Sequence, residues 1–498
     1  MGALLTVGGS YTPAAEKVEP GAGLMLRSRI PTFERTAIIP SNQPRAGSTP
    51  RPGLAARIAA ARLIEQVVDN HVALDQLTAQ VGGLKEWTAL EERDRGLARA
   101  IAVTGLRHRG AISAVLKTLL DRPLPKRARH LLHTLNAAAA QILYMDVPDH
   151  AAVDLAITAL KNDPRSTRFV ALGNALLRRI AGNKEELLEN ADRTGAGFPE
   201  WLSPALRSDY GRENLRRIEQ AVANEPALDL TLHPRLDPDT REKVAVALQA
   251  LVLPTGTVRV KSDSPVEDLP FYSEGHWWVQ DAASALPARM LGDVAGLKVA
   301  DLCAAPGGKT GQLAAAGALV TAVDISSARM ERLSENLARL RLQAELVIAD
   351  ILEWSPQERF DAILLDAPCS STGTMRRHPD VIWTKQPADI EALVRLQRQL
   401  ITRASSLLKP GGRLVYANCA ILKAEGEKLV AEILGSRGQP EPAAIPLRRE
   451  PLASDEIPGT DGMINSAGDL RTLPFHLQTE EPAMSGMDAF FACRFNHI

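Results

Sequence analysis

The second half of the chain alternates short apolar segments with helical ones, and this alternation limits its possible folds more than any other feature. Amphipathic helices are expected at residues 327–340 and 387–408, for example. This pattern predicts an α/β domain with a doubly wound parallel sheet over about residues 271–498, whose ligands bind at the carboxyl ends of the strands. The predicted strands are residues 297–302, 319–323, 345–348, 362–365 and 413–417.

The first predicted strand runs into a glycine-containing turn. The spacing of its glycines and lysine differs from both the GxGxxG fingerprint and the Walker loop. By itself a Pro-Gly-Gly turn is usually no more than a turn. Its place between the first strand and a helix favours a ligand-binding loop, because glycines let a ligand approach the backbone. The turn follows Asp301 and Leu302 and reads Cys303, Ala304, Ala305, Pro306, Gly307, Gly308, Lys309 and Thr310.

Two further aspartates end the second and third predicted strands. Asp324 is placed to accept hydrogen bonds from both hydroxyls of a ribose. Asp350 is placed to reach the exocyclic amine of an adenine. Each aspartate taken singly is more simply a helix cap or a turn former, but acids in register at consecutive strand ends indicate a cofactor that contains adenosine.

Two cysteines follow the fourth and fifth predicted strands. Cys369 comes three residues after Asp366, and Cys419 comes directly after the segment 416–418. A lone cysteine is usually a small buried hydrophobe. Two of them beside an acid and a cofactor loop favour thiolate chemistry. The four cysteines of the chain have no CxxC spacing, which predicts neither a metal site nor a disulfide framework and fits a reducing compartment.

The first half of the chain is organised differently. Residues 1–53 are rich in Gly, Pro, Ser and Thr, which predicts a disordered tail or a start codon placed too far upstream. Residues 54–190 show helical apolar periodicity and short connections, so an all-α bundle is expected. Residues 191–270 are mixed and predict a small α+β connector.

Charge is unevenly distributed. The whole chain has a net charge of −1, but residues 51–130 contain 14 Lys/Arg and 8 Asp/Glu, a local net charge of +6. A localised basic face is what contact with nucleic-acid phosphates requires. A solvated, arginine-rich helical surface is the simpler alternative.

The motifs DLCAAPGGKT, LLDAPCSSTGTMRRHPD and LVYANC resemble the signature of the RNA 5-methylcytosine methyltransferases. Residues 92–95, 147–153 and 174–179 resemble a NusB-type RNA-binding domain. This pair of domains is similar to the layout of the bacterial small-subunit (16S) ribosomal RNA cytosine-5 methyltransferases, and the resemblance covers about residues 54–495. It implies a NusB-like helical domain followed by a Rossmann-like methyltransferase domain.

The resemblance also implies roles for individual residues. Cys419 would add to carbon 6 of the cytosine, and Cys369 would assist the release of the product. Asp366 would hydrogen-bond the ring nitrogen or amino group of the base, which must leave its stack. S-adenosyl-L-methionine would be held by Cys303, Ala304, Ala305, Pro306, Gly307, Gly308, Lys309, Asp324, Asp350 and Asp366. We expect Arg376, Arg377 and His378 either to contact nearby phosphates or to form a solvated loop.

The sequence departs from the pattern of the family at several positions near the nucleophile. Asn418 and Ala420 replace the usual Thr and Ser on either side of Cys419. Residues 425–427 read Glu-Gly-Glu where the family has an Asn between glutamates, and Ile382 replaces a lysine. These differences bear on the reactivity of the nucleophile without removing it.

The expected partner is 16S ribosomal RNA, before the small subunit is fully assembled. The enzyme is expected to be a cytoplasmic monomer that binds no metal, membrane or DNA. Alternatives are an enzyme for transfer RNA or another ribosomal RNA position, and an RNA-binding assembly protein with a vestigial catalytic domain. A DNA cytosine methyltransferase uses a Pro-Cys motif like Pro368-Cys369, but Cys419 and the NusB-like region argue against it.

Overall fold

A computed structural model describes residues 51–125, 128–194, 197–262, 264–435 and 445–498, which belong to one compact unit, residues 50–498. The disordered tail predicted for residues 1–53 therefore lies, up to residue 50, outside the described residues. None of the helices in the described ranges is both long and apolar enough to cross a membrane.

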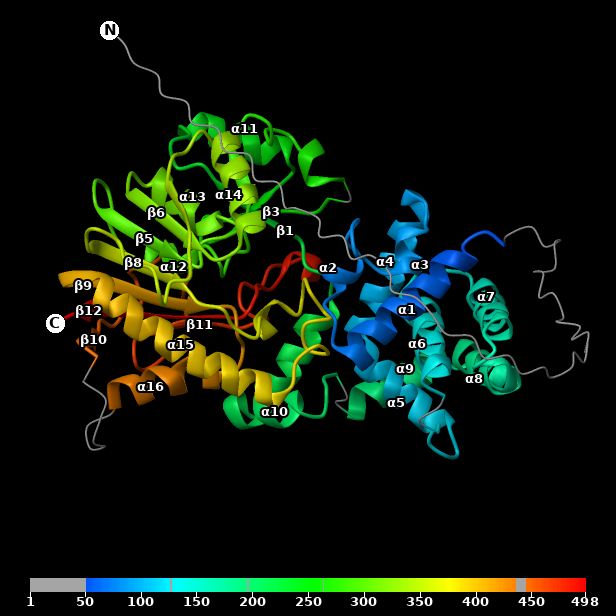
Figure 1. The fold of residues 1–498 in the computed structure, drawn as a ribbon. Coiled ribbons are helices and arrows are strands. Elements are labelled where there is room, and N and C mark those ends of the chain that lie inside the picture. Colours follow the sequence, from blue (N-terminus) through cyan, green and yellow to red (C-terminus); the bar gives the residue numbers. More distant parts are fainter. Residues whose placement is uncertain (1–50, 126–127, 195–196, 263, 436–444) are drawn as a thin grey trace, which may run out of the picture. The chain divides into compact units, whose positions relative to one another are not determined.

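The first part of the described chain is all-helical (Figure 1). Apolar stripes at helical spacing pack into two cores, one around Ile64 and Ile101 on α1 and α4, the other around Leu135 and Leu177 on α6 and α8. The helices are α1 (Leu54–Asn70), α2 (Leu74–Leu77), α3 (Lys85–Thr88), α4 (Glu92–Arg107), α5 (Arg109–Leu119), α6 (Arg129–Tyr144), α7 (Asp149–Asn162), α8 (Val170–Gly182) and α9 (Lys184–Thr194).

A small four-stranded antiparallel sheet follows α10 (Leu202–Ala223) in the order β2-β3-β1-β4. Its elements are β1 (Leu228–Leu232), α11 (Pro238–Ala247), β2 (Leu251–Val252), β3 (Val258–Val260) and β4 (Trp277–Val279). Because β4 pairs with β1, this sheet takes its last strand from beyond residue 270, the position at which the sequence pattern changes.

The large sheet has the order β10-β12-β9-β8-β5-β6-β7, with β11 paired to β12. Strands β5 to β9 run parallel to one another, and β12 runs antiparallel to β9. The strands are β5 (Lys298–Leu302), β6 (Leu319–Asp324), β7 (Glu345–Ile348), β8 (Phe360–Asp366), β9 (Leu408–Asn418), β10 (Leu447–Arg449), β11 (Leu470–Thr472) and β12 (Phe490–His497).

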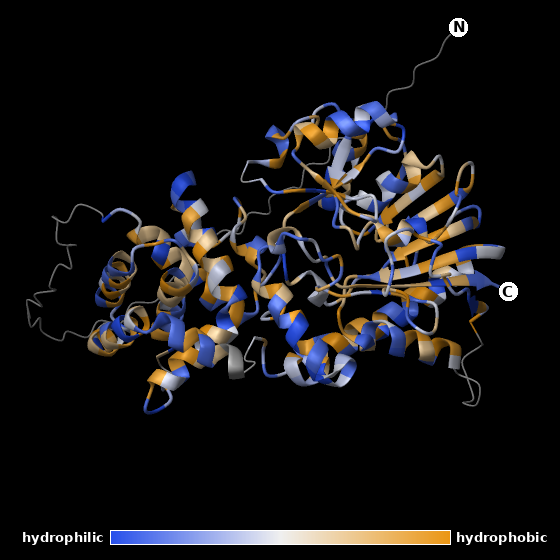
Figure 2. Ribbon diagram, turned by 180° about the vertical axis from the view of Figure 1, so that it is seen from behind, coloured by the Kyte–Doolittle hydropathy of each residue, from blue (hydrophilic) through white to orange (hydrophobic). Residues whose placement is uncertain are grey.

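Alternate residues of these strands face opposite layers of helices, as the two-residue period of a strand requires. Val299 packs in one core with α12 (Leu286–Arg289), α13 (Gly308–Ala315) and α14 (Ser327–Leu340). Its neighbour Ala300 packs in the other core with α15 (Pro387–Leu407) and α16 (Glu427–Gly435). Figure 2 shows that the strands of this sheet are mostly hydrophobic and that the helices are amphipathic. The predicted doubly wound α/β architecture is confirmed, with antiparallel strands added at one edge.

Candidate active site

Two thiols meet at the carboxyl ends of neighbouring parallel strands. Asp366 ends β8 and pairs in register with Ala417 near the end of β9. Cys369 follows in the loop after β8, and Cys419 comes directly after β9. Their Sγ atoms are 3.4 Å apart, and both cysteines are partly exposed. The sheet therefore brings together two cysteines that are 50 positions apart in the chain.

The loop that contains Cys369 is held by a buried carboxylate, Glu425, which the sequence analysis noted only as part of a departure from the family pattern. Glu425 is fully buried and accepts hydrogen bonds from the Ser370 backbone N–H (2.8 Å), the Ser370 hydroxyl (2.6 Å) and the Gln397 amide (3.1 Å). Only its place close after Cys419, in an acidic stretch, hinted at such a role. Glu425 fixes the backbone next to Cys369.

Asn418, one of the departures from the family pattern, belongs to the same network. Its side-chain amide donates to the Glu425 carbonyl (2.8 Å) and the Tyr416 hydroxyl (2.9 Å), and its oxygen accepts from the backbone N–H of Ala420 (3.0 Å). The Ala420 carbonyl in turn accepts from Arg471 (2.7 Å). Asn418 and Ala420, on either side of Cys419, are thus fully buried and hydrogen-bonded. The turn that carries Cys419 is therefore held in place although neither residue is the one usual in the family.

The surroundings of the Cys369 thiol favour its protonated form. The contact with Cys419, burial and the nearby Glu425 raise the pKa of the Cys369 thiol well above its usual value. Cys369 therefore keeps its proton and can donate it in a hydrogen bond to a Cys419 thiolate. Burial, together with Asp366 and Asp324, also raises the pKa of Cys303, which leaves Cys303 a poor source of thiolate.

An ion pair lies at the end of β8. Lys309, in the first turn of α13, places its Nζ 2.7 Å from Asp366 Oδ2 and 3.0 Å from the Ser284 hydroxyl. The ammonium also lies 4.9 Å from the centre of the Phe490 ring. The side chain of Lys309 is 8% exposed and that of Asp366 is 31% exposed, so the carboxylate faces the solvent and the lysine orients it from behind.

The predicted cofactor loop connects β5 to α13. Cys303 and Gly307 have φ of 61° and 103°, and the Ala305–Pro306 peptide bond is cis. A Cβ on Gly307 would lie 2.7 Å from Leu333 Cγ, so glycine is required by both its φ and the close approach of α14. Gly308 opens α13, whose first N–H groups point away from the helix and favour a negatively charged or polar ligand group.

Asp324 and Asp350 lie at the ends of adjacent strands β6 and β7, but in different surroundings. Asp324 is buried, and its carboxylate accepts from the backbone N–H groups of Ala305 (3.2 Å) and Ser326 (3.0 Å). It therefore fixes the turn that follows β5, and each carboxylate oxygen has a second lone pair that can accept a hydrogen bond. Asp350 is exposed and accepts from the Leu352 N–H (2.9 Å).

Ile325, directly after Asp324, was missed by the sequence analysis. It is a large apolar side chain with 69% exposure at the carboxyl end of the sheet, next to the strand end that carries Asp350. An exposed isoleucine beside an exposed carboxylate fits an adenine, which offers an apolar face and an amino group. The residues present at β5, β6 and β7 therefore fit an adenosine-containing cofactor.

From the sequence, Arg376 and Arg377 were expected either to contact phosphates or to form a solvated loop, and the structure contradicts both expectations. Arg376 is 2% exposed and donates to the Ser485 carbonyl (2.7 Å). Arg377 lies among three carboxylates, 2.7 Å from Asp281, 3.6 Å from Asp229 and 3.5 Å from Asp488. Neither arginine is free to contact phosphate or to form a solvated loop, because the loop after Cys369 is folded into the protein; His378 alone is exposed.

The fold and the site define a Rossmann-like, S-adenosylmethionine-dependent methyltransferase with an added helical domain. Residues 289–496 match the family described as 16S rRNA methyltransferase RsmB/F, and residues 54–182 match the NusB family. The chain belongs to the ribosomal RNA small subunit methyltransferase B family, as its similarity to curated relatives shows.

Two of these relatives carry the name ribosomal RNA small subunit methyltransferase B. The protein of Pasteurella multocida is 33% identical over 82% of this chain and 92% of its own length. The protein of Xanthomonas campestris is 34% identical over 78% of this chain and 90% of its own length.

Solved structures share the fold. The crystal structure of PH0851 superposes with a TM-score of 0.64 at 24% identity, covering 90% of this chain and 99% of that one. The crystal structure of NSun6 from Pyrococcus horikoshii with SFG has a TM-score of 0.50 at 18% identity, covering 60% of this chain and 98% of that one.

Proposed function

We propose that this protein methylates carbon 5 of a cytosine in 16S ribosomal RNA, using S-adenosylmethionine and a covalent adduct with Cys419. The observation that carries the proposal is the pair of thiols, 3.4 Å apart, at the strand ends next to the Lys309–Asp366 ion pair. Relatives over most of the chain, named ribosomal RNA small subunit methyltransferase B, support the choice of substrate.

Cys419 would act as the nucleophile. Carbon 5 of cytosine is a poor nucleophile until a group adds to carbon 6. The Cys419 thiolate forms a bond to carbon 6, and carbon 5 then becomes electron-rich enough to accept a methyl cation. The shared hydrogen bond with Cys369, whose pKa is raised by Cys419, burial and Glu425, stabilises the thiolate before attack.

Asp366 and Lys309 would orient the base. The partly exposed Asp366 carboxylate would hydrogen-bond the exocyclic amine of the cytosine or its ring nitrogen. Lys309, 2.7 Å away, keeps the carboxylate in one orientation and balances its charge. Asp366 ends β8, and Cys369 and Cys419 follow β8 and β9 at the same edge of the sheet, so the flipped base would be held with carbon 6 toward Cys419.

The cofactor would be held by the turn from Cys303 to Lys309, with Asp324 and Asp350 toward its ribose and adenine and Ile325 against the adenine ring. When bound, it supplies the electrophilic methyl group. After transfer, a base, which can be a water molecule, would take the proton from carbon 5. The electron pair of that C–H bond would re-form the double bond between carbons 5 and 6, and the bond from carbon 6 to Cys419 Sγ would break with its electron pair returning to the sulfur. The Cys369 thiol lies 3.4 Å from the departing sulfur and would assist this release.

The timing of the reaction, the oligomeric state of the enzyme and its compartment can also be proposed. A base that must leave its stack is accessible before ribosomal RNA is buried in a finished subunit, so we propose action on incompletely assembled particles. We also propose that the protein acts as a monomer in the cytoplasm, where that RNA is made.

The proposal is tested by bisulfite sequencing of total RNA from a strain that lacks the gene. The expected result is that one 16S rRNA cytosine loses its protection from bisulfite and regains it when the wild-type gene is restored. Complementation by Cys419→Ala must not restore it. Loss of protection at a transfer RNA or 23S position instead would reassign the substrate, and no change at any cytosine would refute the enzyme assignment.

A further inference from the structure

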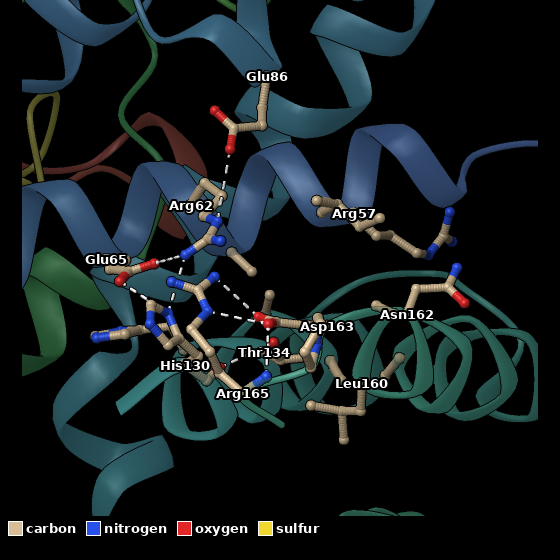
Figure 3. Close-up of a pocket in the computed structure, with 18 of the residues that line it drawn as sticks. Arg57, Arg62, Glu65, Glu86, His130, Thr134, Leu160, Asn162, Asp163 and Arg165 are labelled. Carbon is tan, nitrogen blue, oxygen red and sulfur yellow. Dashed lines mark hydrogen bonds and ion pairs between the residues drawn. The ribbon is translucent and has the colours of Figure 1, made fainter. Parts of the chain in front are cut away.

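A cavity lies within the helical domain, on different elements from the candidate active site. It has a volume of about 510 Å³ and opens between α1, α6, α7 and the loop that follows α7 (Figure 3). This volume falls within the roughly 300–1,000 Å³ typical of small-ligand pockets. None of the residues assigned to catalysis or to the cofactor lines it.

The inner part of this helical-domain pocket is apolar but contains unsatisfied polar atoms. Gln141 and His133 are each 1% exposed. Gln141 Oε1, His133 Nδ1 and Arg57 Nε are buried and have no hydrogen-bond partner among the described residues. Buried polar groups without partners are rare, and each is a reason to look for a ligand. The apolar lining is formed by Ile58, Ala61, Ala137, Ala138, Ala156, Ala159 and Leu160.

The charges around the pocket balance. Its lining contains three arginines and three acids: Arg57, Arg62 and Arg165 with Glu65, Glu86 and Asp163. Such a lining does not select a strongly anionic ligand such as free phosphate. It suits a neutral group that offers both donors and acceptors at its edge.

Acidic neighbours hold the planar guanidinium groups of two of these arginines in fixed orientations. Arg165 Nε and Nη2 donate to the two oxygens of Asp163 at 3.0 and 2.9 Å. Arg62 donates to Glu65 (2.5 Å), contacts His130 Nδ1 (2.9 Å) and lies 3.7 Å from Glu86, as the dashed lines of Figure 3 show. A guanidinium fixed by acids is a preorganised surface on which a planar ring can stack.

We infer that this pocket receives one unpaired nucleobase of the RNA substrate, at a distance along the strand from the cytosine that is methylated. The inference rests on the proposed function for the presence of an RNA. A nucleobase is neutral and planar and has donors and acceptors on one edge for Gln141, His133 and Arg57. Specific RNA recognition commonly uses bases that are splayed out, stacked on arginine or aromatic planes and hydrogen-bonded at their edges.

The surroundings of the pocket favour a nucleotide within a strand over a free nucleotide. Residues 51–130, which supply α1 and its neighbours, have a net charge of +6, while the pocket lining itself is balanced. Basic side chains of this segment that lie on the surface would hold the phosphates of the chain while one base enters the pocket.

The test measures the affinity of the full-length protein for fluorescein-labelled single-stranded RNA 10-mers of each base composition, by anisotropy. Gln141→Leu removes the buried acceptor at similar volume, and Ala159→Trp fills the pocket from α7. Gln76→Leu, an exposed glutamine in α2 outside the pocket, is the matched control. Affinity for S-adenosylmethionine and the melting temperature are measured for each variant, to show that the fold and the catalytic domain are intact.

We expect both pocket variants to bind the preferred 10-mer about tenfold more weakly, corresponding to the loss of one hydrogen bond or of stacking. Gln76→Leu should bind as the wild type does. A 10-mer with abasic sites should bind the wild type and the pocket variants equally. Unchanged RNA affinity in folded Gln141→Leu and Ala159→Trp would overturn the inference.

Two further outcomes distinguish an RNA site from a small-molecule site, and this inference from the proposed function. Free nucleoside 5′-monophosphates that bind the pocket in a Gln141-dependent way, with RNA affinity unaffected, would show a small-molecule site and overturn the RNA assignment. Methyl transfer to 16S rRNA is assayed with the same preparations. Methylation with no pocket effect refutes this inference alone, whereas pocket-dependent RNA binding without any methylation refutes the proposed function alone.

Discussion

The Cys369 and Cys419 sulfur atoms lie 3.4 Å apart, within hydrogen-bonding distance, at the ends of two strands that pair in register. Only one of two thiols so close together can readily ionise. The contact raises the pKa of Cys369, and burial and Glu425 raise it further. The pair is therefore arranged for one proton donor and one thiolate, which predicts different results when each is removed.

Cys419→Ala should abolish methyl transfer, whereas Cys369→Ala should accumulate a covalent RNA–protein adduct, because the bond to carbon 6 forms but is not released. Denaturing gel electrophoresis with labelled RNA and S-adenosylmethionine detects the adduct. The adduct should disappear in the double variant. Full activity of Cys419→Ala would assign the nucleophile to another residue.

Asp366→Asn should lower kcat about 10²–10³-fold, because a neutral amide loses the charge-assisted contact with the base and with Lys309. The fold should be retained, since the side chain is partly exposed. Single-turnover kinetics measure the effect. Asp361→Asn is the matched control, because Asp361 pairs with Lys409 (2.6 Å) near the start of β8, at the opposite end of that strand.

Gly307→Ala should weaken S-adenosylmethionine binding at least tenfold, because a Cβ would lie 2.7 Å from Leu333 Cγ and displace the loop. Isothermal titration calorimetry measures the affinity. Gly256→Ala is the control: its φ is +80°, but a Cβ there would contact nothing within 4 Å. Both variants should lose roughly 1 kcal/mol of stability from the left-handed backbone. Equal cofactor affinity in both variants would contradict a role for this turn in binding.

Arg377→Met should destabilise the protein by about 3–5 kcal/mol, because it removes the nearby counter-charge of the buried Asp281 and Asp488 carboxylates. Burial and the neighbouring Asp281 already raise the pKa of Asp488 to about 7. Urea unfolding at pH 7 measures the loss. Adding Asp488→Asn to Arg377→Met should recover part of it, since one buried charge is removed. A loss below 1 kcal/mol would show that Arg377 is solvated, contrary to its position among Asp229, Asp281 and Asp488.

Stability should fall as the pH is lowered from 7 to 5, in part through His108. Burial, with a contribution from Arg107, lowers the pKa of His108 to about 4, below its ordinary value of 6.5. Between these values the unfolded chain binds a proton that the folded protein does not, so acid favours unfolding. His108→Phe keeps the ring that stacks on Tyr144 at 3.7 Å but cannot titrate.

The variant should lose about 2 kcal/mol less than the wild type between pH 7 and pH 5. Urea unfolding at the two pH values measures this difference, in which the acid effects common to both proteins cancel. Equal losses would mean that His108 is protonated in the folded protein.

Several elements were predictable because their signals are local. The predicted strand at residues 345–348 and helix at 327–340 coincide with β7 and α14, since a period of two or of about 3.6 residues can be counted within one segment. The strand predicted at 413–417 is longer in the structure, where β9 begins at Leu408. The polar and glycine residues before position 413 hid its first part, which pairs with Phe360.

The sequence by itself determined the alternation of strands and helices, the glycine turn, and the two cysteines and acids at strand ends, because these are properties of neighbouring residues. Only the tertiary structure decided that Arg376 and Arg377 are buried, that Glu425 holds the Cys369 loop, and that the helical domain contains a pocket. Those outcomes depend on partners 55 to 207 positions away, such as Glu425 with Ser370 and Asp488 with Asp281, and they are fixed by packing and desolvation as the chain folds.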